Sequence, residues 1–143
     1  MMFKNLEEIK NFLRRKGLQP SFQRVKILEF LDIHRTHPTA DEIFKSLVRT
    51  VPTISKATVY NTLRSFVEKG IIQELTIEEN ELRYDINTQP HAHFKCRVCG
   101  KIYDLPLEDC ESLLLKGTGF RVEKIDVYLK GICPICAKKG KIN

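Results

Sequence analysis

The chain has 143 residues, 42% of them hydrophobic, and a formal net charge of +6. This length suits one domain or two small ones, and we expect two compact halves. The positive charge favours a polyanionic partner, although a similar excess is common in proteins that bind nothing acidic. The sequence has no apolar run that would span a membrane, and it begins with an amphipathic pattern rather than a signal sequence. We therefore expect a soluble, cytoplasmic protein without a membrane partner.

The first fifty residues predict three helices. Apolar side chains recur at helical spacing over residues 3–15, which indicates the first helix. Ser21 is a favourable N-cap for a second helix, whose buried face would include Leu28. Thr39 and Glu42 have the spacing of a capping box, so a third helix should begin there.

A fourth helix and a hairpin follow. The helix begins at Thr53 or Ser55 and runs to Lys69, and β-prone runs at 71–77 and 82–86 would pair. Helices followed by a two-stranded hairpin make a winged helix, in which the fourth helix enters the major groove of DNA. We therefore assign residues 1–85 to a winged helix-turn-helix DNA-binding domain.

The outward face of this fourth helix carries residue types that read DNA. Asparagine can bond adenine, arginine can bond guanine, and alanine or threonine methyl groups can touch thymine. Basic side chains nearby suit phosphate groups. The alternative is an ordinary surface helix with a solvated polar face. The candidate DNA-binding residues are Lys56, Ala57, Thr58, Tyr60, Asn61, Arg64 and Arg24.

Residues 86–90 predict a hinge, and a second domain would occupy 91–143. If residues 91–96 are extended, His91 and His93 share one face of the strand. A turn centred between residues 98 and 99, with a strand returning along 101–105, would place His93 opposite Asp104.

The rest of the second domain predicts a helix and a β-rich run. The helix would begin at Pro106 and run through Lys116, and the β-rich run covers 120–130. Cys110 lies on the apolar stripe of this helix, as either a core residue or a reactive thiol. The fold class is therefore α+β, with an N-terminal winged helix and a C-terminal α/β domain.

Four of the five cysteines form two Cys-x-x-Cys pairs, the composition of a closed, tetrahedral structural zinc site. The zinc would join the two ends of the second domain. The alternative is a thioredoxin-type redox pair, but that chemistry needs a single pair near a βαβ pattern. The candidate zinc ligands are Cys96, Cys99, Cys133 and Cys136.

A second metal site is indicated by His91 and His93 together with Asp85 and Asp104. Such a set without sulfur suits iron(II) or manganese(II), and it also accepts zinc. For each histidine taken alone, the alternative to a metal ligand is an ordinary surface or core residue. Spacing does not assign His37, but if it joins, the ion would link the two domains and fix the angle between them.

Six stretches resemble the ferric uptake regulator (Fur) family over nearly the whole chain. The family consists of dimeric, metal-dependent bacterial repressors with an N-terminal winged helix and a C-terminal dimerisation domain. The resemblance therefore implies a homodimer on a double-stranded operator with an inverted repeat. The stretches are LQPSFQR (18–24), HPTADEI (37–43), ATVYNTLR (57–64), RYD (83–85), HAHFKCRVCGKIYDL (91–105) and CPIC (133–136).

Within the family, the chain most resembles the peroxide-responsive repressor (PerR) branch, whose regulatory ligands match His37, Asp85, His91, His93 and Asp104. Iron-sensing members usually carry glutamate at the positions of Asp85 and Asp104. In the peroxide-responsive branch, iron-catalysed oxidation of histidines matching His37 and His91 releases the repressor, whereas a manganese form represses yet ignores peroxide.

These features predict a peroxide-sensing repressor rather than an enzyme. The first alternative is a repressor of the same architecture that responds to iron or zinc supply. The second is a thiol oxidoreductase or zinc enzyme that uses the Cys-x-x-Cys pairs. A zinc enzyme would need an open metal position, and four thiolates leave none.

Overall fold

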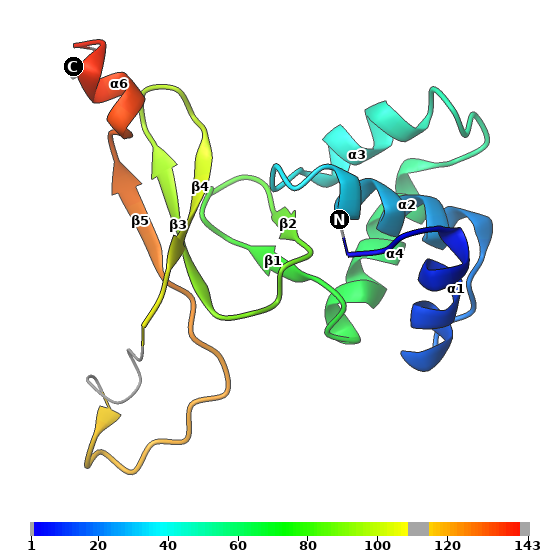
Figure 1. The fold of residues 1–143 in the computed structure, drawn as a ribbon, viewed down its shortest axis with the longest axis horizontal. Helices are drawn as coiled ribbons and strands as arrows, with labels where there is room; N and C mark the ends of the chain where they lie inside the picture. The colour runs from blue at the N-terminus through cyan, green and yellow to red at the C-terminus, as the bar shows by residue number, and fades with distance from the viewer. Residues whose placement is uncertain (1, 109–114, 141–143) are drawn as a thin grey trace. The chain divides into compact units, whose positions relative to one another are not determined.

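The computed structural model of the chain describes residues 2–108 and 115–140. It divides into two compact units, Met1–Thr88 and Gln89–Asn143, which Figure 1 shows with their helices and strands labelled. No helix in the described ranges is both long and apolar enough to cross a membrane.

The N-terminal unit contains four helices, each preceded by a side chain that caps it. Ser21 accepts a hydrogen bond from the Arg24 N–H, and Thr39 forms the predicted capping box with Glu42. The cap of the fourth helix is Ser55 rather than Thr53. The helices are α1 (Leu6–Arg15), α2 (Phe22–Ile33), α3 (Ala40–Leu47) and α4 (Lys56–Glu68).

The apolar faces of these helices share one core. Helix α2 lies against α1, α3 and α4, and α3 also packs on α4. Burial of these side chains is the main favourable contribution to folding. The polar face of α4 stays outside this core. The fully buried side chains of the core include Leu13, Leu28, Ile43, Leu63 and Phe66.

A short antiparallel hairpin, the wing, follows α4. It consists of β1 (Gln73–Leu75) and β2 (Arg83–Asp85), so both strands are shorter than the predicted runs at 71–77 and 82–86. The second strand also attaches to the segment before α3: the Tyr84 N–H donates to the Pro38 carbonyl at 3.0 Å. The wing strand that ends at Asp85 is thereby fixed to the helices.

The C-terminal unit contains a three-stranded sheet in the order β4-β3-β5. Strands β3 (His91–Cys96) and β4 (Ile102–Pro106) are antiparallel, while β5 (Tyr128–Gly131) runs parallel to β3. The hairpin places His93 opposite Asp104, which confirms the predicted register. A short helix, α6 (Pro134–Lys138), follows β5.

Two expectations for this unit were wrong about where the element begins. Pro106 does not begin a helix: it is the last residue of β4 and lies opposite His91. Residues 107 and 108 are not helical, and residues 109–114 of the predicted helix, with Cys110 among them, fall outside the described residues. The β-rich run is a strand only from Tyr128, because the ladder to β3 begins with the His93–Tyr128 pair. Phe120 is 76% exposed.

Candidate metal centres

The four paired cysteines converge at one end of the C-terminal sheet, and each offers a sulfur within 4.8 Å of the others. The Sγ atoms of Cys99 and Cys133 are 3.9 Å apart. A tetrahedral ion with Zn–S bonds of about 2.3 Å would separate its sulfurs by about 3.8 Å. The four thiols are therefore close enough together to share one structural zinc ion.

Backbone N–H groups donate hydrogen bonds to two of these sulfurs, which favours their thiolate form. The Cys133 N–H donates to the Cys96 Sγ at 3.3 Å, and the Cys136 N–H donates to the Cys133 Sγ at 3.5 Å. Burial raises the pKa of Cys96, but amide hydrogen bonds from Cys99, Cys133 and Val98 outweigh it and lower that pKa to about 6. Burial raises the pKa of Cys136 to about 12. A bound cation would therefore be needed to make every sulfur anionic.

Sequence reasoning missed Tyr103, which supports the zinc ligands. Its side chain hydrogen-bonds Cys133, and this bond lowers the pKa of the Cys133 thiol. The same bond, with burial, raises the pKa of Tyr103 to about 12, so the hydroxyl keeps its proton and donates it. The predicted hairpin register could have found it, because Tyr103 lies opposite Phe94 on the face of β3 that carries Cys96.

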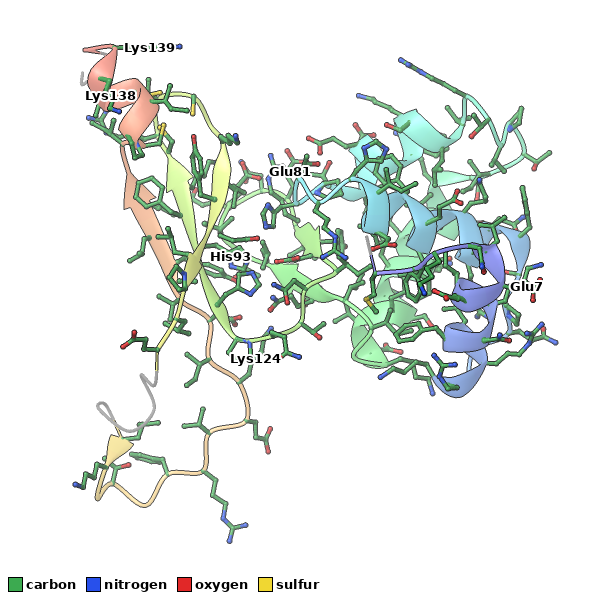
Figure 2. All side chains as sticks on the ribbon, viewed as in Figure 1. Glu7, Glu81, His93, Lys124, Lys138 and Lys139 are labelled. Atoms are coloured by element: carbon green, nitrogen blue, oxygen red, sulfur yellow. The ribbon has the colours of Figure 1, made fainter. Side chains whose placement is uncertain are left out.

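The other face of the same hairpin gathers two imidazoles and a carboxylate. The rings of His91 and His93 are 4.4 Å apart, and Figure 2 shows His93 on this sheet. Their Nε2 atoms lie 3.3 and 3.4 Å from the Asp104 Oδ1. Among these three side chains, His93 is buried and Asp104 is exposed. The arrangement brings nitrogen and oxygen ligand atoms together without sulfur.

A backbone carbonyl orients the first of these rings. The Nδ1 of His91 lies 2.7 Å from the Gln89 carbonyl oxygen. A carbonyl can only accept, so Nδ1 carries a proton, and in a neutral ring Nε2 then holds the lone pair. In that tautomer, Nε2 can coordinate a divalent cation that the Asp104 carboxylate also binds.

The remaining two predicted ligands meet in the N-terminal unit. The His37 Nε2 lies 3.5 Å from the Asp85 Oδ2, and the two side chains are only 6% and 7% exposed. The other Asp85 oxygen accepts the Asn87 N–H at 2.9 Å, which fixes the carboxylate. Each unit thus holds its own group of the predicted nitrogen and oxygen ligands.

The predicted DNA-binding residues lie on the N-terminal unit. On α4, five of them are exposed and Thr58 is half-buried. The hydroxyl of Thr58 is 2.9 Å from that of Ser55, while the guanidinium of half-buried Arg24 donates to the Gln19 carbonyl at 2.8 Å. The wing tip beside this helix is acidic, with Glu79 and Glu81 exposed. The exposed five are Lys56, Ala57, Tyr60, Asn61 and Arg64.

The model of the ferric uptake regulator family matches residues 15–130. The chain belongs to the ferric uptake regulator family. It is 41% identical to the peroxide operon regulator of Bacillus subtilis over 137 residues, which cover 94% of each chain. As a member of this family the protein is a transcription regulator and not an enzyme, so the oxidoreductase alternative is wrong.

Solved structures of the family resemble most of the chain. The ferric uptake regulator of Helicobacter pylori, described as having three functional metal-binding sites, has a TM-score of 0.74 and 25% identity, covering 92% of this chain and 91% of its own. PerR from Streptococcus pyogenes, studied for peroxide sensing and gene regulation, has a TM-score of 0.53 and 33% identity, covering 94% of each chain. The winged-helix and α/β fold class is thereby confirmed.

Proposed function

We propose that the protein is a homodimeric, metal-dependent repressor that senses peroxide through oxidation of its own histidine ligands. One observation carries the proposal: His91, His93 and Asp104 converge as sulfur-free ligands on the hairpin whose other face carries zinc-ligand cysteines. The likeness to a peroxide operon regulator supports it. The chain thus provides for two metals with separate tasks.

The sulfur site serves structure. Cys96, Cys99, Cys133 and Cys136 would hold zinc with all four positions filled by protein, which leaves none for a substrate or an oxidant. Because the ligands come from the β3–β4 hairpin and from the segment around α6, zinc would join the two ends of the C-terminal unit. This unit, residues 91–143, would also supply the dimer contact.

The sulfur-free residues would hold the regulatory metal. His37 and Asp85 belong to the N-terminal unit, and His91, His93 and Asp104 belong to the C-terminal unit. Neither group alone fills the six positions that iron(II) or manganese(II) commonly takes, so we propose that one ion uses both. Occupancy would then set the angle of the DNA-binding domain, residues 1–85, about the hinge at 86–90.

The choice of metal decides what is sensed. When bound, iron(II) would promote cleavage of the O–O bond of peroxide, so that one oxygen atom enters a C–H bond of an adjacent imidazole and the other leaves as water; manganese(II) does not promote this readily. His37 and His91 are the proposed targets. An oxidised imidazole is a poor ligand, so the two groups of ligands would separate and the repressor would leave its operator.

The proposed DNA contact is the exposed face of α4. Asn61 and Arg64 would read base edges in the major groove, while Lys56 and Arg24 would neutralise phosphates. A dimer with two such helices calls for an operator with an inverted repeat of double-stranded DNA. The protein would act in the cytoplasm, where bacterial DNA lies.

The test compares the zinc-containing protein loaded with iron(II) or with manganese(II), each given a brief, low dose of peroxide. Intact mass and peptide mapping locate any oxygen gained, and fluorescence anisotropy follows binding to operator DNA. His34 is an internal control, because this exposed histidine stacks on Phe30 and is not one of the proposed ligands.

We expect one oxygen on His37 or His91 in the iron form, none on His34, and parallel loss of DNA binding. The manganese form should stay unmodified and bound. An iron form that keeps its histidines intact while metal still controls DNA binding would instead make the protein a sensor of iron or zinc supply.

A further inference from the structure

The His37 loop, residues 34–39, joins α2 to α3 and has an unusual backbone conformation. The φ angle of His37 is 57°, the only positive value at a non-glycine residue among those described. A non-glycine residue in this left-handed region is strained and persists only where its surroundings hold it. Contacts around the loop must therefore stabilise His37.

The side chain of Arg83 reaches this residue from the wing. Its guanidinium donates to the His37 carbonyl oxygen at 3.0 Å. It also forms ion pairs with Glu78 and, at 3.8 Å, with Glu42, and it is only 17% exposed. Because Glu42 closes the capping box at the start of α3, Arg83 connects the loop, the wing and the helix.

The strand that carries Arg83 also carries Asp85. Residues two apart in a strand share a face, so the guanidinium and the carboxylate both project toward the His37 loop. Backbone bonds already attach Pro38 and Thr39 to this strand. The guanidinium extends the attachment to His37, whose imidazole then lies 3.5 Å from the Asp85 carboxylate.

We propose that Arg83 is a positioning residue: it holds His37 in the left-handed conformation and thereby pre-organises the His37–Asp85 pair for the regulatory metal. This inference rests on the proposed function. An arginine is required because a planar fork can serve a carbonyl and two carboxylates at once, whereas a lysine ammonium is a point charge. No contact between Arg83 and the metal itself is needed.

The first experiment needs no regulatory metal. In the zinc-containing protein free of that metal, the intraresidue amide-to-Hα nuclear Overhauser effect of His37 reports its positive φ. We expect this signal to weaken in Arg83→Lys and, less strongly, in Glu78→Gln, which loosens Arg83 without removing it. Arg49→Lys, an exposed arginine on the same unit, is the matched control and should leave the signal unchanged.

The second experiment titrates the same variants with manganese(II) by isothermal calorimetry. Loss of groups that orient a metal ligand commonly lowers affinity 10–100-fold. We expect about a 10-fold loss in Arg83→Lys, a smaller loss in Glu78→Gln and none in Arg49→Lys. Zinc content and the amide signals of α1–α4 should be unchanged, which separates positioning from general destabilisation.

His37→Ala separates failure of this inference from failure of the proposed function. If His37→Ala weakens manganese binding but Arg83→Lys changes neither affinity nor the His37 signal, Arg83 does not position the ligand. If Arg83→Lys instead disturbs all the α1–α4 signals and Glu78→Gln has no effect, the role of Arg83 is merely structural. If His37→Ala leaves manganese binding intact, the proposed metal site and the role of Arg83 both fail.

Discussion

Replacing Cys133 with serine should unfold the C-terminal unit and leave the N-terminal unit folded. Among the described residues of the C-terminal unit, the buried apolar side chains are Ala92, Cys96, Ile102, Cys133 and Cys136, so three of the five are zinc-ligand cysteines. The N-terminal unit has a much larger core of its own. Zinc therefore replaces the apolar packing that the smaller unit lacks.

The magnitude follows from the length of chain that zinc closes. A link from Cys96 to Cys133 encloses about 38 residues, and closing a loop of that length stabilises the fold by about 4 kcal/mol in the chain-entropy model. A unit of this size has roughly 3–8 kcal/mol of stability in total. Losing one ligand also forfeits much of the zinc-binding free energy, which is about 10–16 kcal/mol in small zinc domains. The loss of zinc binding alone exceeds the free energy of unfolding of the unit.

The assay is the amide NMR spectrum together with zinc content by mass spectrometry. Cys133→Ser should lose zinc and the dispersed signals of β3, β4 and β5, while the signals of α1–α4 persist. Cys110→Ser, the same substitution at the fifth cysteine, is the control and should retain its zinc. Dispersed signals from β3–β5 in zinc-free Cys133→Ser would refute this reasoning, because apolar packing alone would then suffice.

Three further predictions concern other parts of the chain. Burial raises the pKa of Asp32, but the amides of Met2 and Phe3 and the Arg35 side chain outweigh it, so the pKa falls below its usual 3.8. The stability that Asp32 contributes is thus complete above pH 3.8 and lost as pH falls through the lowered value. Asp32→Asn should cost about 2 kcal/mol at pH 7 in urea unfolding, and progressively less as pH falls below 3.8. Arg64→Ala should weaken operator binding by about 1–3 kcal/mol and relax base preference in anisotropy titrations, whereas Lys56→Ala should lower the salt slope by about one unit. Asp104→Glu should keep metal-dependent DNA binding but blunt the peroxide response, measured as operator release from the iron form; unchanged sensitivity would count against the role of Asp104.

The features that sequence predicted best depend on neighbours within a few residues. Ser21 and Thr39 cap their helices because a short polar side chain can reach the free amides of the first turn. The register that pairs His93 with Asp104 was predictable because a tight turn between Cys96 and Cys99 leaves little freedom in how the strands meet.

Features that depend on distant partners were not predictable. The left-handed backbone of His37 is stabilised by Arg83, which lies 46 positions away in sequence. The residues before Tyr128 have β-forming composition, yet β3 gives strand partners only to Tyr128–Gly131. Composition alone does not say where a neighbouring strand ends.

The two proposed metals should leave the protein in a fixed order, because their ligands differ in kind. The cysteine site is closed by four sulfurs, three of them on buried residues, whereas the hairpin group includes the exposed carboxylate of Asp104. Nitrogen and oxygen ligands bind manganese(II) far more weakly than four thiolates bind zinc. A mild chelator should therefore abolish DNA binding while zinc content and the β3–β5 amide signals stay intact. If zinc and manganese were lost together, one site could not act as a switch while the other maintains the fold.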